Sequence, residues 1–176
     1  MKSSSQNFTK ITLEDFPNLK KNKIGIVVSE WNKDITSNLL AGAQEKLIEF
    51  GIKNENIKIS WVPGSFELVY GCKELSKQNL DAIIAIGCVI KGETDHYDFI
   101  CNAVSNGIMQ LNISYSIPVI FCVLTDHNKN QSLDRSGGKL GNKGAEAAIA
   151  ALKMISLIKI FISLALASIE FSSNSF

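Results

Sequence analysis

Four short runs of mostly apolar residues divide the chain, and each predicts a β-strand. They are Ile24–Ser29 (IGIVVS), Ile57–Val62 (IKISWV), residues 81–90 (DAIIAIGCVI) and the run VIFCVLT after Pro118. The first run is rich in β-branched residues, which is typical of a strand buried on both faces. The third run is uniformly apolar.

Helical patterns lie between the strands. Ile35, Leu39, Ala43 and Leu47 recur every four residues with charged side chains between them, and Gly51 stands where a helix would end. We expect further helices over residues 65–78, along a face running from residue 97 to residue 111, and from near residue 145 onward. The stretch 131–144 is expected to be a polar, glycine-rich connection.

Strands that alternate with helices predict the fold class. Such alternation is typical of βαβ units with a parallel sheet and right-handed crossovers. We expect an α/β domain of three layers (α/β/α), flavodoxin-like, with a four-stranded parallel sheet in the order 2-1-3-4. Ligands of such sheets bind beyond the carboxyl ends of the strands. The loops that start there are residues 30–34, 63–66, 91–96, 126–130 and, through the last connection, 135–144.

Composition narrows the function classes. A length of 176 residues with 45% hydrophobic residues is enough for one globular domain with a real core. A net charge of +1 argues against a nucleic-acid partner. Two histidines are too few for a zinc signature, so we expect no metal. The cysteines are expected to be free in a reducing compartment; they are Cys72, Cys88, Cys101 and Cys122. The N-terminal segment lacks the apolar core of a secretory signal, which predicts a cytoplasmic protein.

An uncharged apolar run, residues 160–169, follows Lys159 near the end of the chain. Ten residues are too few to span a bilayer, which needs about 20, so we expect no membrane partner. Two interpretations stay open: the last helix continues and packs on a neighbouring subunit, or the segment is a flexible tail.

The segment Gly92-Glu-Thr-Asp-His96 joins a buried strand to a helix. Unpaired N–H groups and the helix dipole make such a junction an anion site, and Thr94 or Asp95 is a candidate helix cap. His96 in the first helical turn is a candidate for proton transfer near neutral pH. A surface histidine without a catalytic role is the alternative that position alone leaves open.

Three further segments carry candidate binding residues. Arg135 offers a bidentate fork to a phosphate within a glycine-rich loop that does not match a Walker A motif; a flexible basic loop is the alternative. Trp31 stands where it would stack on a flat heterocycle, and Glu67 where it would accept hydrogen bonds from hydroxyl or ring N–H groups. A core aromatic and a helix-start acid are the alternatives for these two. All three segments are expected at the same edge of the sheet.

Five stretches carry a resemblance to a known family: VVSEWN, WVPGSFEL, GCVIKGETDHYDFICNAVSNGI, PVIFCVLT and DRSGGKLGNKGAEAA. In this order and spacing, over about residues 23–157, the chain resembles the 6,7-dimethyl-8-ribityllumazine synthases of riboflavin biosynthesis. The resemblance implies condensation of 5-amino-6-(D-ribitylamino)uracil with 3,4-dihydroxy-2-butanone 4-phosphate. Phosphate and water are released, and no cofactor is needed.

The resemblance also implies roles for single residues. His96 matches the proton-transfer histidine, and Trp31 matches the aromatic that stacks on the pyrimidine. The pyrimidine and ribityl chain would further contact Ser65, Phe66, Glu67, Cys88, Val89, Ile90 and, from the adjacent subunit, Phe121. The phosphate would be bound by Glu93, Thr94 and Arg135, with Lys139 and Lys143 as candidate further contributors. Asp95 precedes His96 where many members carry an uncharged residue; it would either raise the histidine pKa or cap the helix.

The chain organisation follows from the same resemblance. We expect an N-terminal arm (1–22), a catalytic domain (23–158) and an apolar tail (159–176) that departs from the family. The family forms pentamers, and the short connection from Arg135 to Gly144 predicts closure of twelve pentamers into a hollow icosahedral shell. Riboflavin synthase is a candidate partner. The alternative function is a non-catalytic flavin- or lumazine-binding shell protein of the same fold.

Overall fold

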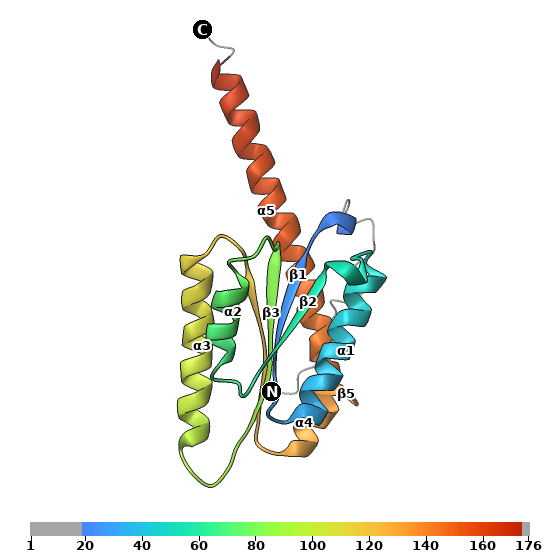
Figure 1. The fold of residues 1–176 in the computed structure, drawn as a ribbon, viewed down its shortest axis with the longest axis vertical. Coiled ribbons are helices and arrows are strands. Elements are labelled where there is room, and N and C mark those ends of the chain that lie inside the picture. The colour runs from blue at the N-terminus through green and yellow to red at the C-terminus, as the bar shows by residue number, and fades with distance from the viewer. Residues whose placement is uncertain (1–18, 174–176) are drawn as a thin grey trace.

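A four-stranded parallel sheet forms the middle layer of the fold (Figure 1). The structure is a computed structural model that describes residues 19–173. The strands are β1 (Ile24–Ser29), β2 (Ile57–Val62), β3 (Ala82–Ile90) and β4 (Val119–Asp126). Their order is β2-β1-β3-β4, and every neighbouring pair is parallel. The predicted fold class and strand order are confirmed.

Helices cover both faces of this sheet (Figure 1). On one face lie α2 (Leu68–Leu75) and α3 (His96–Ser114). On the other lie α1 (Lys33–Glu49) and the first half of α5 (Lys143–Ser173). Alternate residues of the central strands belong to two apolar clusters, one on each face of the sheet. Ile26 and Ile84 pack toward α1 and α5. Val27 and Ile83 pack toward α2 and α3. The remaining elements are the 3₁₀ turns η2 (Leu19–Lys21) and η3 (Asn54–Asn56), helix α4 (Lys129–Arg135) and the hairpin strands β5 (Ser136–Gly138) and β6 (Gly141–Asn142).

The polar, glycine-rich connection over residues 131–144 contains ordered elements that were not predicted from the sequence. That stretch holds most of α4 and the whole β5–β6 hairpin. Asn128 caps α4 because its Oδ1 accepts a hydrogen bond from the Gln131 N–H at 3.1 Å. Ser132 on α4 is fully buried, which fixes the helix against the domain. The polar composition of this segment therefore gave no indication of its regular structure, which depends on side-chain hydrogen bonds and burial.

Two predicted helix boundaries also needed correction. The helix expected over residues 65–78 is the shorter α2, Leu68–Leu75. The residues on either side of it form turns with hydrogen bonds between residues three apart, as from the Gln78 N–H to the Leu75 carbonyl. Helix α5 begins at Lys143 instead of near Ala145. Its start is set by Asn142, whose Oδ1 accepts from the N–H of Gly144 and whose Nδ2 donates to the Asn38 carbonyl, each at 2.8 Å.

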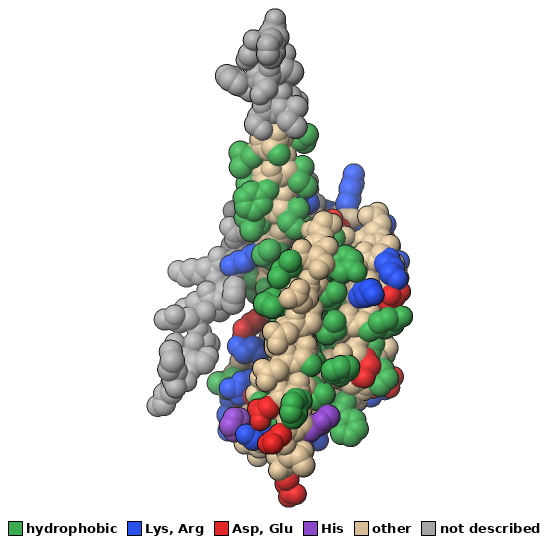
Figure 2. Space-filling view, turned by 90° about the vertical axis from the view of Figure 1, so that its left-hand side faces the viewer, with side chains coloured by type: hydrophobic (Ala, Val, Ile, Leu, Met, Phe, Trp, Pro, Cys, Tyr) green, Lys and Arg blue, Asp and Glu red, His purple; other side chains and the backbone are tan. Residues whose placement is uncertain are grey.

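The end of the chain continues as a helix, since α5 extends to Ser173 and projects beyond the domain (Figure 1). Apolar side chains lie on the face of the projecting part that is visible in Figure 2, and Phe161 and Leu164 are each 61% exposed. This confirms the helical part of the first interpretation of the tail; its contact with a neighbouring subunit stays a prediction. Length and composition alone would let Lys143–Leu166 cross a membrane. However, Ala148, Leu152 and Ile155 of this stretch are buried against the domain.

The predicted N-terminal arm lies mostly outside the described residues. Of its last four residues, Leu19 is buried in the core. Asn22 is also buried, and its Oδ1 accepts a hydrogen bond from Lys159 Nζ on α5 at 2.9 Å. The described end of the arm is therefore attached to the domain on the side where α5 leaves it.

Candidate active site

A cleft of about 750 Å³ opens at the carboxyl ends of β1, β2 and β3. We call it the first cleft. Its walls come from the loops after these three strands and from the first turns of α3. The residues that line it are Trp31, Pro63, Gly64, Ser65, Phe66, Glu67, Cys88, Val89, Ile90, Gly92, Thr94, His96, Tyr97 and Ile100.

Trp31 is placed by the turn from β1 into α1. The N–H groups of Glu30 and Trp31 donate to Val62 and Pro63, which extends the pairing of β1 and β2 beyond both strands. Asn32 then takes a left-handed conformation (φ 57°), and its Nδ2 donates to the Cys88 carbonyl at 3.0 Å. Trp31 is left 70% exposed at the cleft wall. An indole in this position is not a core aromatic, and its open face suits stacking on a flat ring.

The turn after β2 supplies a hydroxyl, a second aromatic ring and a carboxylate. Phe66 is 56% exposed, and Glu67 is exposed beside it. Ser65 is only 6% exposed, yet its Oγ has no hydrogen-bond partner among the described residues. A buried hydroxyl without a partner is unfavourable unless a ligand or water completes it. Ser65 therefore marks the floor of the first cleft as a polar contact point for a ligand.

His96 is the first residue of α3 and is exposed at the cleft. Asp95 occupies the N-cap position but makes no side-chain cap hydrogen bond, so its predicted capping role was wrong. The Asp95 carbonyl instead accepts from the N–H groups of Asp98 and Phe99. Helix α3 has 19 residues and no side-chain cap, and its first residue lines the cleft, so the positive end of its dipole lies at the cleft. Thr94 lines the cleft with His96, whereas Glu93 does not.

The end of β3 forms the back of the first cleft through Cys88, Val89 and Ile90. The Cys88 side chain is fully buried, and burial raises the pKa of its thiol to about 11. Burial likewise raises the pKa of Cys72 and of Cys122 to about 12. These three thiols stay protonated at neutral pH, which makes them unsuitable as nucleophiles. All four cysteines are free, as predicted.

The remaining predicted residues lie elsewhere. A second cleft, of about 500 Å³, opens along the start of α5 and along β4, which is the edge strand of the sheet within residues 19–173. It is lined by Phe121, Arg135 and Lys143, together with Asp126 and Glu146, and it shares no lining residue with the first cleft. Lys143 Nζ pairs with Glu146 at 2.8 Å. Lys139, in the turn between β5 and β6, lines neither cleft.

One chain therefore does not bring the candidate proton-transfer histidine and the candidate phosphate arginine into one pocket. Sequence reasoning assigned no role to three further residues. Asn32 fixes the turn that holds Trp31, Asp126 contacts Arg135, and Ser132 donates a hydrogen bond to Asp126. Of these, only Asn32 could have been found from the sequence, because it directly follows Trp31. Within residues 19–173, no group of three His, Cys, Asp or Glu residues is arranged to hold a metal ion.

Comparison with known proteins connects this arrangement to a family. The profile of the family described as 6,7-dimethyl-8-ribityllumazine synthase matches residues 21–159. Proteins of that name from Christiangramia forsetii, Flavobacterium johnsoniae and Cytophaga hutchinsonii are 54%, 56% and 53% identical to this chain. The matches cover 90%, 88% and 88% of this chain and 96%, 82% and 98% of those relatives.

The chain belongs to the 6,7-dimethyl-8-ribityllumazine synthase family. It is thereby an enzyme of the transferase class with a role in riboflavin biosynthesis. The family match includes every candidate site residue, from Trp31 to Lys143, and it ends at Lys159. The projecting part of α5 thus begins where the match to the lumazine synthases stops.

Proposed function

We propose that this chain condenses 5-amino-6-(D-ribitylamino)uracil with 3,4-dihydroxy-2-butanone 4-phosphate to 6,7-dimethyl-8-ribityllumazine, releasing phosphate and water. The observation that carries the proposal is the first cleft. It combines two exposed aromatic rings, an unpartnered buried hydroxyl and a histidine at the start of a helix. Family membership supports the same reaction, since the relatives bear the name of its product.

The pyrimidine and its ribityl chain fit the inner part of the first cleft. Trp31 and Phe66 offer apolar faces to the flat ring. Ser65 Oγ and the Glu67 carboxylate offer hydrogen bonds to ring N–H and hydroxyl groups, and Ser65 is completed by such a contact. The end of β3 from Cys88 to Ile90 closes the cleft behind the substrate.

The phosphorylated ketone fits the mouth of the cleft. Thr94 and the first N–H groups of α3 form an anion site there, beside His96. Attack of the substrate amine on the ketone needs a proton delivered to the carbonyl oxygen, and the later loss of phosphate and water needs further proton transfers. We assign these transfers to His96, which lines the cleft beside this site. No cofactor takes part, and much of the acceleration comes from holding two substrates together.

A complete site needs a second chain. Arg135 would supply the positive charge for the phosphate and Phe121 a further aromatic contact, but both line the second cleft of this chain. The second cleft lies along the edge of β4 that has no partner strand among the described residues, and such an edge suits contact with another subunit. We therefore propose that the first cleft of one subunit and the second cleft of its neighbour form one active site, with Lys143 as a further cation.

Mixed oligomers test this shared site. Subunits carrying Phe121→Ala retain His96, and subunits carrying His96→Ala retain Phe121. When both are co-expressed with different tags, random mixing leaves about a quarter of the interfaces with neither lesion. The specific activity of the mixed oligomers should exceed that of either variant alone. If thoroughly mixed oligomers show no gain, the active site is built within one chain.

The assembly is proposed to be a shell of twelve pentamers. The hairpin connection between Arg135 and Gly144 is short, which suits closure, and the projecting apolar part of α5 is proposed to pack on a neighbouring subunit. Light scattering and electron microscopy should give a particle of about 60 subunits. A sample that contains only pentamers or decamers across a range of phosphate concentrations would contradict the shell and leave the enzyme activity untouched.

A non-catalytic lumazine- or flavin-binding shell protein is the second candidate, because the same cleft would hold such a ring. Turnover separates the two. When the purified protein is mixed with both substrates, an enzyme forms many equivalents of the lumazine chromophore per subunit, whereas a binding protein forms none. We place the reaction in the cytoplasm, where riboflavin synthase is a candidate partner that would use the product.

A further inference from the structure

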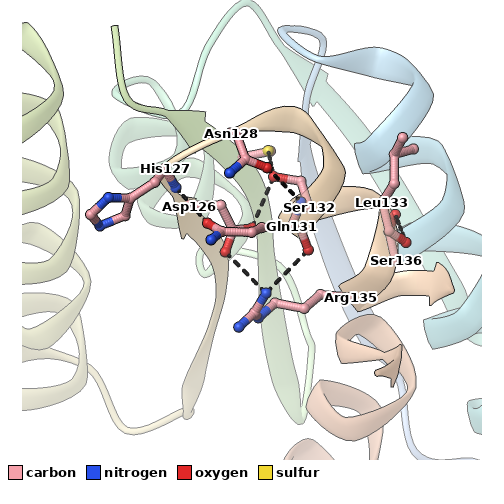
Figure 3. Close-up of polar contacts among 9 residues, drawn as sticks. Asp126, His127, Asn128, Gln131, Ser132, Leu133, Arg135 and Ser136 are labelled. Carbon is pink, nitrogen blue, oxygen red and sulfur yellow. Dashed lines mark hydrogen bonds and ion pairs between the residues drawn. The ribbon is translucent and has the colours of Figure 1, made fainter. Parts of the chain in front are cut away.

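Asp126 is a buried carboxylate at the end of β4 (Figure 3). It also lines the second cleft. Its side chain is 8% exposed. Its Oδ1 lies 3.5 Å from Nη1 of Arg135, and its Oδ2 accepts a hydrogen bond from the Ser132 hydroxyl at 2.8 Å. A buried charge is unfavourable unless it is paired and hydrogen-bonded, and Asp126 has both kinds of partner.

Ser132 has its proton directed toward Asp126. The Ser132 side chain is fully buried on α4, and its Oγ accepts a hydrogen bond from the Cys88 thiol at 3.5 Å. Burial raises the pKa of Cys88 to about 11, so the thiol keeps its proton at neutral pH and acts as the donor. The Ser132 hydroxyl then donates to the carboxylate. The orientation of Asp126 is thereby fixed from the end of β3, which is also the back of the first cleft.

Arg135 is held at one nitrogen. Nη1 lies near Asp126 Oδ1 and also donates to the Gln131 carbonyl at 3.2 Å (Figure 3). These two acceptors come from β4 and α4, so the guanidinium is anchored to two elements. Among the described residues, no acceptor contacts its Nε or Nη2. The donors of that free edge remain available for a bidentate contact with an oxyanion in the cleft.

We propose that Asp126, oriented by Ser132, is a positioning residue that fixes Arg135 for the phosphate group of the four-carbon substrate. This rests on the proposed role of Arg135 in phosphate binding. A carboxylate beside an arginine has two opposing effects on an anion: it reduces the positive charge, and it holds the guanidinium in place. Positioning predicts that loss of the carboxylate weakens phosphate binding, whereas charge reduction alone predicts that it strengthens it.

The test uses the whole oligomer and inorganic phosphate as the probe. Asp126→Asn should raise the inhibition constant of inorganic phosphate and the KM of the phosphorylated ketone by about tenfold, and leave the KM of the pyrimidine unchanged. Ser132→Ala should act in the same direction with a smaller effect. Asp34→Asn is the matched control, because it removes a carboxylate from the exposed ion pair of Asp34 with Lys129, at the other end of α4, and should change neither constant.

A double-mutant cycle shows whether Asp126 acts through Arg135. In an Arg135→Ala background, Asp126→Asn should have no further effect on phosphate inhibition. Tighter phosphate binding in Asp126→Asn, equal losses for both substrates, or a loss that persists in the Arg135→Ala background would each overturn the positioning role. If Arg135→Ala itself leaves phosphate inhibition unchanged, the proposed role of Arg135 fails, and the role of Asp126 fails with it. If Asp126→Asn does not fold, Ser132→Ala carries the same comparison.

Discussion

Replacement of His96 by alanine should lower the rate of lumazine formation by about 10²–10⁴-fold, because the side chain that delivers and removes protons is lost. His96 is exposed at the start of α3 and supports no part of the core, so the variant should fold and assemble as the parent does. Some activity should remain, since the cleft still holds both substrates in place. The measurement is the initial rate at saturating concentrations of both substrates, with oligomer size checked by light scattering.

His127 provides the matched control. It is also exposed, but its side chain points away from the Asp126–Arg135 contacts (Figure 3), and it lines neither cleft. His127→Ala should therefore keep the parental rate. If His96→Ala stays within about twofold of the parent, His96 has no part in the rate-limiting proton transfer.

Replacement of Gly144 by alanine should destabilise the fold by about 3 kcal/mol or more, which is at the upper end for overpacking. A Cβ at this position would overlap the backbone carbonyl of Leu39 on α1. Backbone cannot move aside as a side chain can, and α1 and the start of α5 pack together in the core. The Asn142 contacts to Asn38 and Gly144 hold the same junction. The effect should appear as a lower midpoint in denaturant unfolding, together with a loss of soluble oligomer.

Gly92→Ala is the control for this prediction. A Cβ at Gly92 would meet no atom within 4 Å, and the backbone there does not require glycine. Its stability should stay within about 1 kcal/mol of the parent. Equal stability of the Gly144→Ala variant and the parent would mean that the start of α5 is not in close contact with the Leu39 carbonyl of α1.

The sheet could be predicted because its signals are local. The central strands β1 and β3 are buried on both faces, and such strands are continuous apolar runs in the sequence. Pro63-Gly64 and Pro118 mark the neighbouring breaks. Helix α4 could not be predicted in the same way. It is seven residues long and polar, and its order depends on the Asn128 cap and on the burial of Ser132.

The candidate site was predictable in part for a related reason. Ser65, Phe66 and Glu67 are adjacent in the sequence, and Thr94 and His96 are separated by one residue. Each group follows a predicted strand, so both groups could be predicted to lie at the same edge of the sheet, where they line one cleft. The sequence did not indicate that the predicted site residues are divided between two clefts. That division depends on the position of β4 at the edge of the sheet and on the positions of Arg135 and Lys143 on α4 and α5. The contacts of Asp126 with Ser132 and of Ser132 with Cys88 join separate elements, so they could not be predicted from the spacing of these residues in the sequence.

The most direct test is a time course with both purified substrates and the untagged protein, in which the lumazine chromophore and free phosphate are measured together. We predict that chromophore and phosphate rise in equal amounts, over many equivalents per subunit, and that omission of either substrate abolishes both signals beyond the uncatalysed background. Absence of chromophore formation above the protein-free control, or phosphate release without chromophore, would contradict the proposed condensation.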